Sequence, residues 1–311
     1  GDNIRITGHI NDEASNNLAG YPIFVYYNNS PANFTNNIKT QDDTWWNTSW
    51  IHRLPINISE NSGNDLYNYT VNVSVNTSGL ISNNKMQIDC RDIRFADNST
   101  NELNFWIENC NSENTTTWIK LNLTAYQSKT IYMYYGNQDA ASNQNATNTF
   151  LFYDDFEDYS TTDVAEHERW TIVSGTEWSI YDDSGNKVLK DATTSQNPNM
   201  IYGNYSGANY SYRASIKVVA DSGNTKYGLL AYYTEANTND TYGFWGDNLS
   251  STGFTQIALE IYSGGDWGSW DSIDHDTSTK ISPGDSWTVM EWKNYDGIIS
   301  GWINFTKKTN G

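Results

Sequence analysis

The clearest pattern in the chain is a strict alternation of polar and apolar residues. Residues 67–78 read YNYTVNVSVNTS, with Asn, Thr or Ser at every even position. A period of two is typical of a strand with one buried face, because successive side chains point to opposite sides. The pattern therefore predicts a strand whose Tyr69, Val71, Val73 and Val75 enter a core and whose polar residues point outward.

Short alternating segments of this kind recur along the chain. Aromatic and β-branched residues, which favour strands, are abundant, and no long segment has the i, i+3, i+4, i+7 spacing of an amphipathic helix. The expected strands are IRITGHI (4–10), YPIFVYY (21–27), HRLPINIS (52–59), YNYTVNVSV (67–75), IRFAD (93–97), LNFWIE (103–108), TWIKLNLT (117–124), TIYMYYGN (130–137), YSYRASIKVVA (210–220), YGLLAYYT (227–234) and those within 285–304. The fold class is therefore predicted to be all-β, with tandem, jelly-roll-like β-sandwich domains preceded by an N-terminal strand pair.

The spacing of these strands predicts three segments. Residues 1–44 hold a strand pair and a linker, which resemble the opening of an immunoglobulin-like module that stops too early to be complete. Residues 45–149 and 150–311 each form a β-sandwich. An isolated hairpin is marginal in water, so the N-terminal strands need partners. Two alternatives remain open: they pair with their own chain, or they complete the sheet of a neighbouring subunit.

Acceptor triplets for N-linked glycans, N-x-S/T, occur about twice as often as the composition would produce by chance. Three of them follow one another along the outward face of residues 67–78, so we expect a hydrated, glycan-covered strand there. The sixteen acceptors are Asn28, Asn33, Asn47, Asn57, Asn68, Asn72, Asn76, Asn98, Asn114, Asn122, Asn145, Asn204, Asn209, Asn239, Asn248 and Asn304. Covalent N-glycans are thus the first expected partners, and they require an extracellular location.

Charge narrows the class of protein further. The chain has 18 basic and 37 acidic residues, a net charge of -19, which argues against nucleic acid as a partner. No apolar run approaches the length of a membrane span. Gly1 is not preceded by a basic and apolar leader, as expected of a mature exported protein. The acidic character and the density of glycan acceptors favour an archaeal cell surface over a eukaryotic secreted protein.

The two cysteines predict a disulfide. The segment between Cys90 and Cys110 reads as strand, turn and strand, and symmetric pairing about its turn would place Phe95 opposite Phe105 and the two cysteines opposite each other. A cross-strand disulfide is then geometrically reasonable and suits an oxidising compartment. Two buried free thiols are the alternative.

Several motifs in residues 45–156 occur in a fixed order. They are Trp50 with Arg53, Pro55 and Ile56; DIRFAD at 92–97; Leu103 with Trp106, Ile107 and Glu108; WIK at 118–120; IYMYYGN at 131–137; and Phe152 with DDF at 154–156. Together they resemble the family catalogued as domain of unknown function 2341, which occurs in large secreted and surface proteins of archaea and bacteria. The resemblance brings no established chemistry and no catalytic residues.

Residues 150–311 resemble a concanavalin A-like lectin/glucanase sandwich. The resemblance rests on FYDDFED (152–158), on Trp170, Val173, Gly175 and Trp178, and on the strands at 210–220, 227–234 and 285–304. Such domains usually end with another strand or two after the segment that matches WINF. We therefore expect this closing strand to be missing here or supplied by another element.

Catalytic chemistry is not expected. Glycoside hydrolases on such a fold carry paired carboxylates, typically as E-x-D-x-x-E, and the chain has no such triplet. The histidines stand apart from any Ser or Cys nucleophile motif, so solvated or turn-forming roles are the better interpretation. They are His9, His52, His167 and His275.

Two acidic clusters raise the question of calcium. Asp154, Asp155, Glu157 and Asp158 stand at the entrance of the second sandwich, and Asp271, Asp274 and Asp276 stand in a predicted Gly- and Ser-rich loop. Carboxylate oxygens suit Ca²⁺, and the resemblance to lectins implies a structural ion. The alternative is an acidic surface cluster in an acidic protein. No cofactor is required by either interpretation.

Tryptophans in glycine-rich segments are the candidates for sugar binding. YGFWGD (242–247) and GGDWGSWDS (264–272) read as loops in which glycines leave Trp245, Trp267 and Trp270 little local cover. Core packing is the alternative, because tryptophan is mostly buried in folded proteins.

The leading hypothesis is a non-enzymatic, glycan-coated cell-surface protein with a structural or adhesive role. It includes a filament or sheath subunit in which identical chains assemble head to tail by strand exchange. The alternative is a carbohydrate-binding module of a secreted polysaccharide-degrading system, with surface polysaccharide as its partner.

Overall fold

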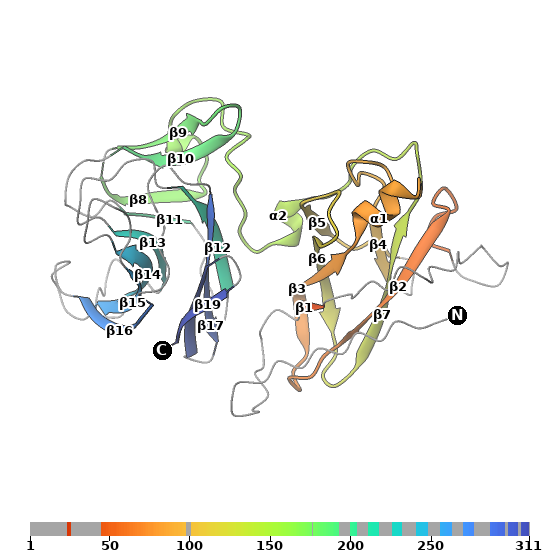
Figure 1. Cartoon of the computed structure of the whole chain (residues 1–311), viewed down its shortest axis with the longest axis horizontal. Coiled ribbons are helices and arrows are strands. Elements are labelled where there is room, and N and C mark those ends of the chain that lie inside the picture. Colours follow the sequence, from red (N-terminus) through yellow and green to blue (C-terminus); the bar gives the residue numbers. More distant parts are fainter. Residues whose placement is uncertain are drawn as a thin grey trace. The chain divides into compact units, whose positions relative to one another are not determined.

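The computed structural model describes the chain in two compact units, residues 1–154 and 155–311 (Figure 1). The division falls a few residues after the predicted boundary at 149/150. The described residues are 24–25, 45–97, 101–175, 177–192, 200–203, 211–217, 226–231, 241–247, 256–262, 270–276, 287–295, 298–303 and 306–310. The predicted strand at 4–10 lies outside them.

The first unit contains two sheets. The sheet β1-β3-β6-β5 consists of β1 (Phe24–Val25), β3 (Leu66–Val75), β6 (Thr115–Leu123) and β5 (Phe105–Glu108). The sheet β2-β7-β4 consists of β2 (His52–Ser59), β7 (Ser128–Tyr135) and β4 (Arg94–Asp97). Two short helices accompany them, α1 (Thr77–Ser82) and α2 (Ala146–Thr149). The described pairings of this unit are antiparallel, except that β1 runs parallel to β3. The all-β prediction is thus confirmed.

The two sheets share one hydrophobic core. Val71 and Ile119 of one sheet and Ile56 and Ile131 of the other are almost fully buried in the same cluster. All four occupy the apolar positions of alternating strands, which is why the period of two located this face correctly. Burying such side chains contributes roughly 1.5–3 kcal/mol each.

The predicted hairpin between the cysteines is correct only next to its turn, where Ala96 and Glu102 form an antiparallel bridge and Leu103 N donates to Phe95 O at 2.8 Å. β4 pairs with β7 and β5 pairs with β6, so the two strands belong to different sheets. Phe95 and Phe105 do meet, with ring centroids 5.4 Å apart, but they meet in the core between the sheets. The chain therefore passes from one sheet to the other between β4 and β5.

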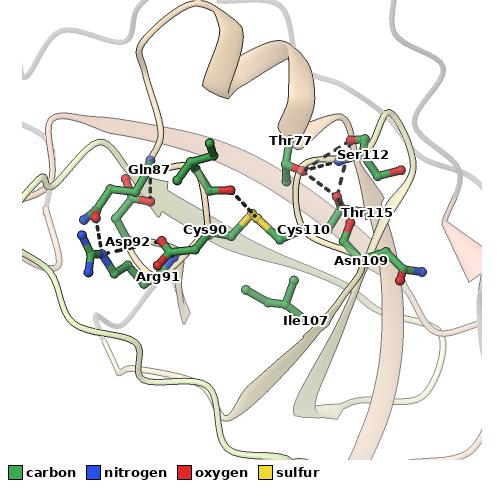
Figure 2. Close-up of a disulfide and its surroundings, with 12 residues drawn as sticks. Thr77, Gln87, Cys90, Arg91, Asp92, Ile107, Asn109, Cys110, Ser112 and Thr115 are labelled. Atoms are coloured by element: carbon green, nitrogen blue, oxygen red, sulfur yellow. Dashed lines mark hydrogen bonds and ion pairs between the residues drawn. A yellow bond between two sulfur atoms is a disulfide. The ribbon is translucent and has the colours of Figure 1, made fainter. Parts of the chain in front are cut away.

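The disulfide between Cys90 and Cys110 is confirmed, with Cα atoms 5.9 Å apart. It joins the loop before β4 to the end of β5, and so it links the two sheets and not two neighbouring strands (Figure 2). On the Cys110 side, Thr77 and Thr115 bind each other through their hydroxyl groups at 2.6 Å, and both are buried. The bridge is therefore part of a closed, hydrogen-bonded end of the sandwich.

The second unit begins with β8 (Trp170–Ser174), β9 (Trp178–Asp182), β10 (Lys187–Asp191) and β11 (Met200–Gly203), and with a 3-10 turn at Val164–Glu166. β9 pairs with β10, and β8 pairs with β11. Tyr159, Val164 and Ile180 form a small buried cluster beneath these strands.

Two four-stranded sheets make up the rest of the second unit. One has the order β12 (Ser211–Ile216), β17 (Thr288–Tyr295), β18 (Ile298–Ile303) and β19 (Thr306–Asn310). The other has the order β13 (Lys226–Ala231), β14 (Thr241–Asp247), β15 (Gln256–Tyr262) and β16 (Trp270–Asp276). β19 corrects the expectation of a missing closing strand, because it follows the WINF segment and pairs with β18.

Candidate functional site

Half of the predicted glycan acceptors lie in the described residues, all in the first unit. Four are exposed: Asn68, Asn114, Asn122 and Asn145. Three are half-buried: Asn47, Asn57 and Asn76. Asn72 is buried, with only 7% of its surface exposed. The acceptors outside the described residues are Asn28, Asn33, Asn98, Asn204, Asn209, Asn239, Asn248 and Asn304.

Asn72 corrects the expectation of three acceptors on one wet face. It lies directly opposite Trp118 on the outer side of β3 and β6. The Trp118 ring contacts Phe150 at 5.5 Å, and Phe150 stacks on Tyr153 at 5.9 Å. The segment after α2 thus covers this part of the sheet with aromatic rings, as the contact of α2 with β5 and β6 also shows (Figure 1). A glycan on Asn72 would have to displace this cover.

Two acceptor asparagines are the N-cap residues of helices. The amide oxygen of Asn76 accepts hydrogen bonds from Gly79 N at 2.7 Å and Ser78 Oγ at 3.0 Å at the start of α1. Asn145 accepts from Asn148 N at 2.9 Å at the start of α2. Asparagine is a preferred N-cap residue for this reason, so these triplets have a cause other than glycosylation. The bonds use the amide oxygen and not the nitrogen that carries a glycan.

Asn68 and Asn122 form a pair across β3 and β6. The backbone N–H of Asn68 donates to Oδ1 of Asn122 at 2.7 Å. Asn68 lies in a break of the strand register between Leu66 and Tyr69, with a φ of 51°. Asparagine tolerates this left-handed conformation better than most residues, which explains its place in the bulge. The bond uses Oδ1 of Asn122, and Nδ2 takes no part in it.

Two tyrosines flank this asparagine pair at the same end of the sandwich. Tyr67 precedes Asn68 and is 73% exposed, and Tyr126 lies in the turn after β6 and is 74% exposed. Asp65 connects the two segments: Oδ1 accepts from Ala125 N at 2.9 Å, and Oδ2 accepts from the Tyr67 hydroxyl at 3.3 Å. We call Tyr67, Asn68, Asn122 and Tyr126 the tyrosine–asparagine surface. Sequence reasoning missed the tyrosines, because alternation alone does not mark an exposed ring.

Glu60 holds the turn that carries Tyr126. Its side chain is buried, at 2% exposure, and its carboxylate accepts from the backbone N–H groups of Ser62 at 2.5 Å, Gly63 at 3.0 Å and Tyr126 at 3.0 Å. Burial by itself raises the pKa of Glu60, but these hydrogen bonds outweigh it, and the pKa lies below its usual value. The carboxylate is therefore ionised at neutral pH and fixes the turn.

The motif residues that carried the family resemblance form a buried network. Asp92 is fully buried and accepts from Gly136 N at 2.8 Å and Gln87 N at 3.1 Å, while Trp50 donates to its backbone oxygen at 2.6 Å. The guanidinium of Arg94 lies 5.1 Å from the Trp50 ring centre. The hydrogen bonds of Asp92 and Trp50 stabilise the fold, because each of them joins two separate segments of the chain.

The four predicted calcium ligands do not converge. Asp158 pairs with Arg169, whose hydrogen bonds lower the pKa of that carboxyl group. Glu157 accepts from Lys187 N at 2.9 Å, and Asp155 accepts from Glu157 N at 3.3 Å. Asp154 also interacts with another part of the protein. Within the described ranges no three His, Cys, Asp or Glu side chains lie close enough together to hold a metal ion.

The other predicted site residues lie in strands. Trp245 is in β14 between Gly228 and Ala258, and Trp270 begins β16. The expectation of loops is therefore wrong for these two, and Trp267 lies outside the described residues. Asp271, Asp274 and Asp276 are also in β16 and not in a loop.

The histidines of the described residues differ in their surroundings. The centres of the His52 and Tyr135 rings lie 5.1 Å apart. Burial of His52 lowers its pKa, and the positive charge of the nearby Lys85 lowers it further. His167 meets the Tyr159 ring at 4.5 Å, and His275 pairs with Ala258. His9 lies outside the described residues.

Comparison with known proteins gives one family match. The sequence pattern of the family described as Domain of unknown function (DUF2341) matches residues 89–173. The chain is therefore similar to this family over the last part of the first unit and the start of the second. None of the curated proteins compared with the chain matches it. In the part of the chain that is described, no helix has the length and apolar character needed to cross a membrane.

One solved structure is similar to part of the chain. It is the carbohydrate-binding module CBM66 from Bacillus subtilis, with 16% sequence identity and a TM-score of 0.34. The match covers 46% of this chain and 78% of the module.

Proposed function

We propose that this protein is a non-catalytic, N-glycosylated component of a cell surface, with a structural or adhesive role. The observation that carries the proposal is the exposure of acceptor asparagines in the first unit. Asn114 and Asn122 present their side chains to solvent, and each is followed by the required hydroxyl residue, Thr116 or Thr124. The glycans would extend outward without disturbing the core.

The disulfide supports an extracellular location. Disulfides form and persist in oxidising compartments, and Cys90 and Cys110 bridge the two sheets of the first unit. The net charge of -19 agrees, because it favours a hydrated, soluble exterior. The motif residues Asp92 and Arg94 act in packing, which supports a structural and not a catalytic use of the family region.

The proposal is tested on protein purified from its native source. The intact mass should exceed the 35.3 kDa of the polypeptide by the mass of several glycans. Intact cells treated with an amine-reactive reagent that cannot cross membranes should yield labelled protein. A native mass equal to that of the polypeptide, or labelling only after lysis, would contradict the proposal.

Assembly by strand exchange is the more specific part of the proposal. β1 pairs with β3 in parallel through Phe24 and Val25, so within one chain the N-terminal segment adds to the sheet at β3. We propose that in a filament the same strand accepts the segment of a neighbouring copy, head to tail. Deletion of residues 1–44 should abolish polymers seen by electron microscopy while the disulfide-linked sandwich stays folded. Polymers formed by the truncated chain would exclude exchange by this segment.

Carbohydrate binding is the second candidate function. Trp245 pairs with Gly228 on one side and Ala258 on the other, so small residues flank it within the sheet. The two four-stranded antiparallel sheets of the second unit are compatible with a lectin-like sandwich. A polysaccharide pull-down should distinguish the candidates: retention lost in Trp245→Ala, but kept in Trp287→Ala, would favour binding. No retention by the wild-type protein would exclude it for the polysaccharides tested.

A further inference from the structure

The tyrosine–asparagine surface has a feature that the fold does not require. Tyr126 has a φ of 56°, in the left-handed region that bulky residues avoid. A residue other than glycine or asparagine there costs roughly 1–2 kcal/mol. The backbone N–H of Tyr126 donates to Glu60, a bond that any residue except proline would make. Glycine or asparagine at this position would relieve the strain in the turn.

The position of the ring is nevertheless well defined. A Cβ atom added to Gly63 would lie 2.3 Å from the Tyr126 hydroxyl oxygen, so the ring end lies across the bare backbone of Gly63. Most of the ring still faces solvent. A single exposed aromatic residue is ordinary and needs no explanation. An exposed aromatic ring that is held in place on a strained backbone indicates contact with something outside the polypeptide.

The acceptor on Asn122 is the nearest source of such a contact. Oδ1 of Asn122 accepts from Asn68 N at 2.7 Å, and the Nδ2 that would carry a glycan takes no part in this bond. Thr124, which completes the triplet, is exposed and leads directly into the turn that carries Tyr126. Tyr67 lies on the other side, next to Asn68 in the register break opposite Asn122. A sugar on Nδ2 would therefore start at the end of the sandwich that also carries these two exposed rings.

We infer that the first sugar rings of an N-linked glycan on Asn122 pack against Tyr126 and Tyr67. This inference rests on the proposed glycosylation. Tyrosine suits the contact, because its ring offers an apolar face while its hydroxyl remains hydrated. A weak interaction suffices, since the covalent link holds the sugar at a high effective concentration. The packed glycan covers the exposed rings and restrains the strained turn.

The test combines two substitutions in protein made by the native host. Thr124→Ala removes the acceptor triplet but leaves Asn122 and its bond to Asn68 intact. Tyr126→Ala removes the ring and keeps the glycan. Amide hydrogen exchange of residues 124–127 is then measured in the wild type, in both single variants and in the double variant. Tyr126→Phe and Ile88→Ala are controls, because the first keeps the ring and the second removes an equally exposed residue beside no acceptor.

Loss of the glycan by Thr124→Ala should speed exchange in the turn about tenfold in the wild type, and less than twofold in the Tyr126→Ala background. Tyr126→Phe should behave as wild type, and Ile88→Ala should leave the tenfold effect unchanged. Equal effects of Thr124→Ala in both backgrounds would overturn the inference while leaving glycosylation standing.

Two further outcomes distinguish the inference from the proposed function. Glycopeptide mass spectrometry that finds Asn122 bare would overturn both at this site. Glycan released from the native protein, added at millimolar concentration to Thr124→Ala, should give no protection. Full protection by this free glycan would identify a binding site for external carbohydrate and overturn the assignment to the protein's own glycan.

Discussion

The two ends of β3 carry the same sequence pattern in different surroundings. Around Asn72 the outer face lies under Trp118 and Phe150, and the acceptor is buried. At Asn68 the strand register breaks, and the acceptor is exposed beside Asn122. Alternation therefore predicts which face a residue occupies in the regular part of the strand, but it predicts neither the register break nor whether a later segment covers that face.

The comparison changes the meaning of a dense run of acceptors. Asn72 lies buried on a face that carries aromatic rings, Asn76 caps a helix, and Asn68 occupies a left-handed bulge. Asn68 and Asn76 thus have local structural reasons, and the surroundings decide which of the three is accessible for a glycan.

Removing an aromatic residue beside Asn72 should have the largest effect on stability. Trp118→Ala should lower the free energy of unfolding by about 3–5 kcal/mol, because a buried indole that contacts Phe150 is lost. Tyr67→Ala, at the open end, should change it by less than about 0.5 kcal/mol. Urea unfolding of both variants checks this difference. Equal losses of unfolding free energy in the two variants would mean that the surroundings of Asn72 and of Asn68 do not differ in packing.

Breaking the disulfide should give the next largest effect. Replacing Cys90 and Cys110 by serine removes a link between residues 20 apart and should cost about 3 kcal/mol. Urea unfolding measures the loss, and labelling of free thiols in the native wild type should give none. Two thiols that react without denaturant would show that the bond is not formed in the native protein.

Glu60 should make the open end sensitive to acid. Its pKa is lowered in the folded state, so its contribution is complete above the pKa of the unfolded chain and is lost as the pH falls through the folded pKa. Glu60→Gln should cost roughly 1–2 kcal/mol at neutral pH and remove this acid dependence. Hydrogen exchange of residues 124–127 between pH 6 and pH 3 gives the comparison. An identical pH dependence in wild type and variant would contradict the role of Glu60.

The smallest effect separates capping from glycosylation at Asn76. Asn76→Ala should cost about 1 kcal/mol, because it removes the cap of α1. Asn76→Asp also removes the acceptor but keeps a capping oxygen, so it should be close to neutral. Thermal unfolding of the two variants from a host without glycosylation decides this. Equal melting temperatures would show that the cap contributes nothing.

The sequence predicted the strands and the core better than it predicted the surfaces. HRLPINIS matches β2 residue for residue, and Val71 and Val73 lie in the core as their spacing required. The hairpin at 93–107 holds only at the Ala96–Glu102 bridge, because short-range symmetry cannot tell pairing within a sheet from crossing between sheets. Phe95 and Phe105 nevertheless meet.

The candidate site was predictable only in part. The acceptor triplets are visible in the sequence, but the cover over Asn72 comes from Phe150, almost 80 residues later in the chain. The exposure of Tyr126 depends on a left-handed turn fixed by Glu60, which is distant in sequence. Such long-range contacts leave no local pattern that a reader of the sequence could use.

Occupancy of Asn72 and Asn122 in the native protein tests the central claim most directly. Both asparagines belong to complete N-x-S/T triplets, and they differ chiefly in whether other parts of the chain cover them. Glycopeptide mass spectrometry of protein from the native source should find Asn122 occupied and Asn72 bare. A glycan on Asn72, or a bare Asn122 in protein that is otherwise glycosylated, would contradict the claim that cover decides which acceptors are used.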